Sequence, residues 1–156
     1  MSRIKVLQKH IWHVLKKMDD YYDRAEGIAH LHGVAMAAAM IAKGRGQDPE
    51  LAVMAALLHD VYAYKSGSYK DHAHLGAEYA RKTLDRLAIT DEKETDIICD
   101  AIYHHSDKDV IDSPLAEVLK DADVMHHTLN DPTKEIKPHE KERYLNLCEE
   151  FGMEER

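Results

Sequence analysis

The sequence places one histidine–aspartate doublet where burial of either side chain would be energetically unfavourable. His59 and Asp60 follow the segment from Leu51 to Leu58, in which every residue is apolar. A helix of this composition has no solvated face, so it is expected in the interior and carries the doublet inside with it. A buried carboxylate is neutralised unless it is paired or bound to a metal. The doublet therefore predicts either a hydrogen-bonded pair or the centre of a metal site.

Other histidines share buried helix faces. In the segment 91–106, His105 falls at the centre of the apolar face and His104 about a quarter-turn away. In the segment 71–88, His72 lies on the apolar face. His30 is in register with apolar residues of the segment 24–44, although that helix is apolar nearly all round and its phase is weakly diagnostic. One inward histidine is usually a core residue, but three of them beside a buried His–Asp doublet indicate a metal site.

A second carboxylate is available in the segment 114–129. Asp121 and Asp123 flank its apolar stripe at similar angles, so helical phase alone does not choose between them.

These side chains require helices to position them, and strand patterns are almost absent. Asp48-Pro49 and Ser113-Pro114 are cap-then-proline helix starts, and Thr90 is the expected N-cap of a further helix. No linker or repeat divides the chain, so we predict an all-α fold, with residues 1–156 as one compact helical bundle of about six or seven helices. The predicted helices are 3–21, 24–44, 49–63, 71–88, 91–106, 114–129 and 138–151, and residues 130–138 form an irregular connection.

Composition restricts the partners. The chain carries 29 acidic and 21 basic residues, a net charge of −8, which argues against stable binding to nucleic acid or to an anionic membrane surface. No run of about 18 apolar residues occurs, so no membrane span is expected. Cys99 and Cys148 are the only cysteines and form no CxxC motif, which favours a reducing, cytoplasmic location.

The pattern of these residues resembles the HD superfamily of metal-dependent phosphohydrolases. That family has a first His, a His-Asp doublet roughly thirty residues later and a distant Asp, all within a helical core. His30 fits the first position better than His32, because the family's Val and Asp-Pro-Glu follow it at the usual spacing. The distant ligand usually follows Ala, which favours Asp123 and leaves Asp121 in reserve. The resemblance covers about residues 24–130 and implies that these form the core of an HD domain.

A branch of the superfamily carries two further histidines and binds two metals. The first precedes Gly-Ala by four residues, as His72 precedes Gly76-Ala77, and the second ends a helix, as His105 does. The resemblance therefore implies a six-ligand site, in which His104 could replace or support His105. Departures from the family patterns leave the substrate open: the Gly-Tyr-Pro signature of one branch is missing, and no Glu follows the doublet. The implied metal ligands are His30, His59, Asp60, His72, His105 and Asp123.

The expected activity is hydrolysis of a phosphate ester, in a nucleotide or another small molecule, by a metal-activated water. Nitrogen and carboxylate ligands suit Fe, Mn, Co, Ni, Zn or Mg, and two divalent ions are expected. Asp60 is the expected bridging carboxylate beside His59, and Lys65, or alternatively Lys120, is a candidate for neutralising the phosphate. The same ligand set also admits a di-iron oxygenase or a non-catalytic metal-bearing sensor. The last helix could pack on the core or form a homodimer face.

Overall fold

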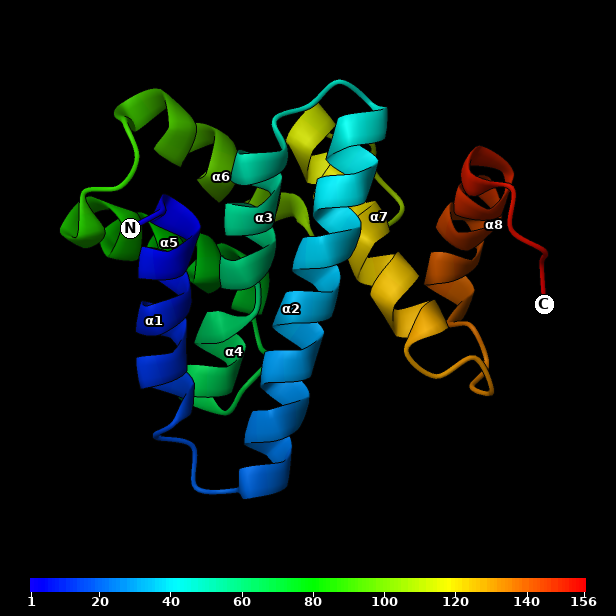
Figure 1. The fold of residues 1–156 in the computed structure, drawn as a ribbon. Helices are drawn as coiled ribbons and strands as arrows, with labels where there is room; N and C mark the ends of the chain where they lie inside the picture. The colour runs from blue at the N-terminus through cyan, green and yellow to red at the C-terminus, as the bar shows by residue number, and fades with distance from the viewer.

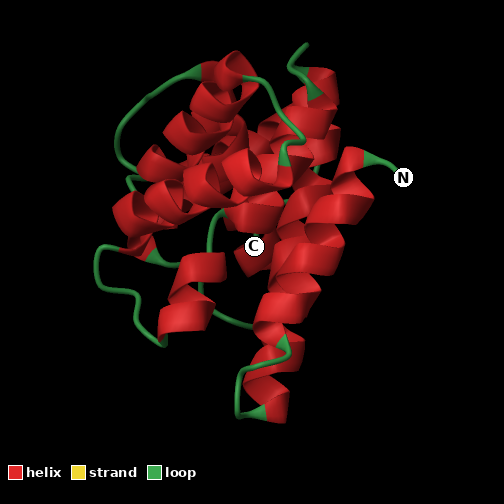
Figure 2. Cartoon of the chain, turned by 90° about the vertical axis from the view of Figure 1, so that its left-hand side faces the viewer, coloured by secondary structure: helices red, strands yellow, loops and turns green.

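The computed structural model describes all residues 1–156 and contains helices without any strand (Figure 2). This confirms the predicted all-α class. Seven helices were expected; the structure divides the third of them into two and adds one 3-10 turn. The helices are α1 (Arg3–Leu15), α2 (Tyr21–Gly44), α3 (Pro49–Leu58), α4 (Val61–Ser66), α5 (His72–Leu87), α6 (Glu92–His104), α7 (Pro114–Leu129), the turn η1 (Pro138–Glu140) and α8 (Lys141–Phe151).

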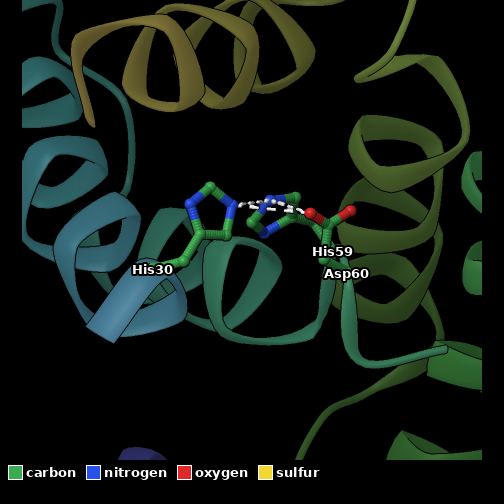
Figure 3. Close-up of side chains that lie close together, drawn as sticks. All are labelled: His30, His59 and Asp60. Carbon is green, nitrogen blue, oxygen red and sulfur yellow. Dashed lines mark hydrogen bonds and ion pairs between the residues drawn. The ribbon is translucent and has the colours of Figure 1, made fainter. Parts of the chain in front are cut away.

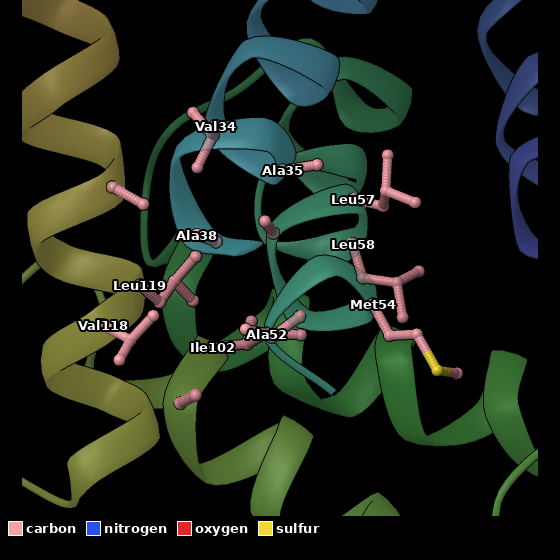
Figure 4. Close-up of a cluster of buried hydrophobic side chains, with 14 of the residues drawn as sticks. Val34, Ala35, Ala38, Ala52, Met54, Leu57, Leu58, Ile102, Val118 and Leu119 are labelled. Carbon is pink, nitrogen blue, oxygen red and sulfur yellow. The ribbon is translucent and has the colours of Figure 1, made fainter. Parts of the chain in front are cut away.

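Helix α3 lies at the centre of the bundle, between α2, α6 and α7, with α1 beside it (Figure 1). Its residues from Ala52 to Leu58 are buried almost without exception, as its uniformly apolar sequence predicts. They belong to one cluster of 35 buried apolar residues to which all eight α-helices contribute. Figure 4 shows side chains of α2, α3, α6 and α7 meeting there. A central α3 places its C-terminal end, and the doublet that follows, inside the molecule.

Helix α3 ends at the doublet and does not continue to residue 63 as the sequence predicted. The backbone of Asp60 adopts φ −114° and ψ 3°, outside the helical region, and α4 starts at Val61. Continuous helix would turn the two side chains about 100° apart. The break instead allows the side chains of both residues to face the same space, as Figure 3 shows.

Three further helix ends differ from the predictions. The first helix stops at Leu15 rather than residue 21, and α2 begins at Tyr21, capped by the carboxylate of Asp20. Helix α6 is capped by Asp91 and not by Thr90, because Asp91 and Glu94 form a reciprocal capping box that satisfies two backbone N–H groups. The hydroxyl of Thr90 pairs with that of Thr95 instead.

Helix α2 is long and apolar enough to pass for a membrane-spanning helix by length and composition alone. Its packing accounts for that composition, since Leu31, Val34, Ala38 and Ile41 are fully buried against the neighbouring helices. Helix α8 lies beside α7 at the edge of the bundle (Figure 1), with Leu147 and Cys148 buried in the common core. These residues of α8 therefore pack on the core of the same chain.

Gly76 lies where α5 packs closely against the backbone of the doublet. A Cβ at this position would lie 3.3 Å from the carbonyl oxygen of His59, a backbone atom that cannot move aside alone. The glycine therefore sets how near α5, and His72 at its start, come to the end of α3.

We expect Gly76→Val to push α5 away from His59 and to lower the free energy of unfolding by about 1–3 kcal/mol, the usual cost of overpacking. Urea denaturation of the metal-free protein measures this. Gly44→Val is the matched control, because nothing lies within 4 Å of a Cβ there; equal stability of the two variants would contradict the close-packing argument.

Candidate metal centre

The six predicted ligands come from five places in the fold and converge on one buried cluster. His30 lies on α2, the doublet follows α3, His72 opens α5, His105 caps α6 and Asp123 lies in the middle of α7. His59 is fully buried, and Asp60 and Asp123 are only 8% and 5% exposed. The ends of α3, α5 and α6 thus meet the sides of α2 and α7.

Two histidines of the cluster, His30 and His59, each lie close to the carboxylates of both Asp60 and Asp123. The Nε2 atom of His30 lies 3.2 Å from Nε2 of His59 and 3.4 Å from Oδ2 of Asp60 (Figure 3). It also lies 3.4 Å from Oδ1 of Asp123. Nε2 of His59 lies 3.4 Å from Oδ2 of Asp60 and 3.6 Å from Oδ1 of Asp123. Separations near 3.4 Å are those of ligand atoms each about 2.1 Å from a shared ion.

The other oxygen of Asp60 faces a second group. Its Oδ1 atom lies 3.5 Å from Nε2 of His72 and 3.3 Å from Nε2 of His105, and these three atoms are close enough to share an ion. Asp60 therefore presents one oxygen to each group, which is the arrangement expected of a bridging carboxylate.

The chemistry of the cluster fits divalent metal ions. Oδ1 of Asp60 and Oδ1 of Asp123 are buried without any hydrogen-bond partner. An unpartnered buried carboxylate oxygen is unfavourable, and a metal ion would satisfy both atoms. The ligand set of imidazoles and carboxylates, without thiolates, suits transition metals in general rather than one of them.

Three of the histidines are oriented by backbone carbonyls. Nδ1 of His59 donates to the carbonyl of Ala56 at 2.6 Å, Nδ1 of His105 to that of Ile102 at 2.7 Å, and Nδ1 of His72 to that of Tyr69 at 2.8 Å. A carbonyl only accepts, so Nδ1 carries the hydrogen in each ring. When neutral, each ring presents its Nε2 lone pair to the cluster, and a hydrogen bond from the other ring nitrogen to a carbonyl is common among metal-binding histidines.

Without metal, the positive and negative side chains of the cluster stabilise one another's charges. Burial opposes the charge of His59, but Asp60 and Asp123 outweigh that effect and raise the pKa of His59 to about 10. Burial likewise opposes the charge of the two carboxylates, yet neighbouring cations, Lys108 and His59 for Asp123 and His59 for Asp60, hold both pKa values well below the usual range. Burial lowers the pKa of His105.

We expect metal binding at pH 7 to release at least one proton per protein molecule. With a pKa of about 10, His59 is protonated in the metal-free protein and must lose that proton to become a ligand. Above pH 10 the ring is already neutral, so this release should fade. Calorimetric titration with a divalent metal in buffers of different ionisation enthalpy measures it; zero release at pH 7 would contradict the assignment of His59.

Two candidate ligands from the sequence analysis, Asp121 and His104, lie outside the cluster. Asp121 forms ion pairs with Arg45 at 2.8 Å and Arg143 at 3.0 Å, so it links α7 to other helices. His104 faces Asp100 and Asp112, because one residue of helix turns its ring away from the side that His105 occupies.

The lysines predicted to meet the phosphate also lie away from the cluster. Lys65 is exposed, with its ammonium 5.7 Å from the ring centre of Tyr79, and it does not line the cavity over the cluster. Lys120 is buried and bonded to Asp112 at 2.6 Å and to the carbonyl of Val110. Neither side chain is placed to act on a substrate bound at the cluster.

Lys108 is the cation that the sequence analysis missed. Its buried ammonium donates at 2.7 Å both to Oδ2 of Asp123 and to the carbonyl of His105, and it lines the cavity over the cluster. These bonds leave Oδ1 of Asp123 as the oxygen that faces the histidines. Lys108 follows the predicted helix in an irregular segment, where periodicity gives no indication of which side chains turn inward.

The cluster opens to solvent through two adjoining cavities. One, of about 330 Å³, is lined by Asp60, His72, His105, Lys108 and Asp123. The other, of about 620 Å³, extends between the start of α2 and the segment after α7. Both share walls formed by His30, Tyr64, Tyr69, His127, Lys137 and Glu140. A small molecule could therefore contact the cluster while its remainder occupies the larger space.

The helical core brings four histidines and two aspartates together under an open cavity. This arrangement is that of a helical protein whose buried histidine–aspartate cluster could hold metal ions. Comparison with known proteins makes this specific. The HD domain family matches residues 27–128, which include every residue of the cluster, and the chain belongs to this family.

Two individual proteins are similar to the chain. A crystal structure of a predicted HD superfamily hydrolase from an uncultured Thermotogales bacterium superposes with a TM-score of 0.61, at 26% identity over 92% of this chain and 88% of the other. Ribonuclease Y of Chlorobium luteolum is 32% identical over 98 residues, which are 63% of this chain but 17% of that protein. The chain thus spans about a sixth of the length of that curated relative.

Proposed function

We propose that the protein is a metal-dependent phosphohydrolase with two divalent ions, acting on a small phosphate ester such as a nucleotide. The observation that supports this most is the position of Asp60, whose two oxygens face two separate groups of histidines. His30, His59, Asp60 and Asp123 would hold one ion, and Asp60, His72 and His105 the other. When bound, a pair of ions supplies a water nucleophile at neutral pH and electrostatic stabilisation of the phosphoryl oxygens.

The residues of the chain would prepare this chemistry by fixing positions and charge. The backbone carbonyls of Ala56, Tyr69 and Ile102 orient three imidazoles before any ion arrives, so little reorganisation is needed. Lys108 holds Asp123 and adds a positive charge at the wall of the cavity, where a phosphate dianion would be bound. The burial of the carboxylates keeps water from competing with these contacts.

The larger cavity supports a substrate with an organic part bigger than the phosphate. Tyr64 and Tyr69 form one wall, with their ring centres 6.5 Å apart, and offer apolar surface. Lys134 and Lys137, in the segment after α7, also line this cavity. The relative named as a ribonuclease adds short oligoribonucleotides to the candidates, although the net charge of −8 favours small substrates over long nucleic acid. We also propose a reducing cytoplasmic location, since both cysteines are buried and unpaired.

Metal analysis of the purified protein, combined with a phosphate-release screen, tests the proposal. The screen should contain p-nitrophenyl phosphate, nucleoside mono-, di- and triphosphates, sugar phosphates and a short oligoribonucleotide, each with Mn²⁺, Co²⁺, Zn²⁺ or Mg²⁺ added. We expect two ions per chain and metal-dependent hydrolysis of at least one compound, abolished by a chelator.

Two other outcomes would replace the proposal. Bound iron with a visible absorption band and oxygen consumption, but no phosphate release, would identify a di-iron oxygenase. Bound metal without turnover of any phosphorylated compound or oxygen would identify a metal-bearing sensor or binding module.

A further inference from the structure

His127 lies beside the cluster, although it is not one of the six ligands that the sequence predicts. It follows Asp123 by one helical turn on α7, so both side chains emerge on the same side of that helix. Its ring stacks on that of His30, with the ring centres 5.3 Å apart and the planes inclined by 15°. The ring lines both cavities, and its side chain is 30% exposed.

The Nε2 atom of His127 is directed at a ligand atom that lacks a partner. It lies 3.4 Å from Oδ1 of Asp123, one of the two buried carboxylate oxygens without a hydrogen bond. The same oxygen lies 3.4 Å from Nε2 of His30. The three ligand atoms are within 4.8 Å of one another, which is close enough for all of them to contact a single ion.

Glu140 holds this ring in place. Nδ1 of His127 donates to Oε1 of Glu140 at 2.8 Å, which leaves Nε2 to face the cluster. Glu140 is 2% exposed, and apart from a His139 contact at 4.0 Å its carboxylate has no other ionic partner. A buried carboxylate that orients an imidazole and raises its basicity is a recurrent feature of metal-binding histidines. The neighbouring His126 has no such partner and contacts Nδ1 of His30 instead.

We propose that His127 is a seventh metal ligand, oriented by Glu140, and that it completes the position formed by His30, His59, Asp60 and Asp123. This position then has five ligands from the protein, whereas the position of Asp60, His72 and His105 has three. The first ion is consequently held more tightly, and the second keeps more sites for water and substrate. The inference rests on the proposed metal centre and does not depend on which reaction the centre performs.

The test is a Co²⁺ titration of the metal-free protein, followed by visible absorption and calorimetry, in His127→Ala and Glu140→Gln. We expect two binding events in the unmodified protein. His127→Ala should weaken the tighter event by more than the roughly 10–100-fold that loss of a ligand's orienting partner costs, and should change the absorption spectrum of the first equivalent of Co²⁺. Glu140→Gln should weaken the same event by a smaller factor. The looser event should be unchanged in both variants.

His32→Ala is the matched control, since His32 is an exposed histidine on α2. It should bind Co²⁺ as the unmodified protein does. Circular dichroism shows whether each variant is folded, and His127→Gln replaces His127→Ala if the latter is not. Unchanged affinity and spectrum of the first equivalent in a folded His127 variant would overturn the inference. Two tight ions without phosphate release would overturn the proposed function and leave His127 as a ligand.

Discussion

Asp60→Ala should lose bound metal and lower phosphate release by on the order of a thousandfold, about 4 kcal/mol of transition-state stabilisation. Asp60 is the one residue with an oxygen at both groups of the cluster: Oδ2 lies 3.4 Å from His30 and His59, and Oδ1 lies 3.3 Å from His105 and 3.5 Å from His72. Its removal therefore weakens both positions at once, whereas loss of any histidine affects one. Metal content by elemental analysis and the rate of phosphate release on the best substrate measure the effect.

Asp121→Asn is the control for this variant. Asp121 is an equally buried aspartate, but its oxygens pair with Arg45 and Arg143 and do not face the cluster. We expect this variant to lose stability while it keeps both ions and the activity. An Asp60→Ala protein with unaltered metal content and turnover would show that the cluster is not the reactive centre.

Lys108→Met should destabilise the metal-free protein by about 3–5 kcal/mol, as measured by urea denaturation. The substitution keeps a long aliphatic side chain but removes the ammonium that donates to Oδ2 of Asp123 and to the carbonyl of His105. Asp123 then keeps a buried negative charge with less compensation. Metal ions compensate the same charge, so the loss of stability should be smaller in the metal-loaded protein than in the metal-free one.

Lys65→Met is the comparison for this prediction. Lys65 is exposed and has no carboxylate partner, so its replacement should change stability by less than about 0.5 kcal/mol and should leave turnover unchanged. An equal loss for Lys108→Met with and without metal would show that Lys108 contributes by packing and not by balancing the charge of Asp123.

The sequence by itself determined the interior of this protein and most residues of its cluster. An all-apolar helix is stable only at the centre of a helical bundle. The apolar segment Leu51–Leu58 therefore predicted the central position of α3 and the burial of the doublet that follows it. Helical phase then predicted that His72 and His105 point into the interior, because an amphipathic helix packs its apolar face against the core. Helical phase did not distinguish Asp121 from Asp123, because both flank the apolar stripe of their helix equally. The family's Ala-Asp pair favoured Asp123.

Only the tertiary structure decided what surrounds these residues. The break of the helix at Asp60, which lets one carboxylate face both groups of histidines, depends on packing and not on any local breaker residue. Lys108 reaches the cluster from an irregular segment, where no periodicity relates a residue number to a direction. Glu140 reaches His127 from the 3-10 turn η1, which the sequence predicted as the first turn of an α-helix. His127 is placed by a partner thirteen residues away and by the stacked ring of His30 from another helix. Local sequence thus fixes which face of a helix is buried, while contacts between distant segments fix which atoms meet there.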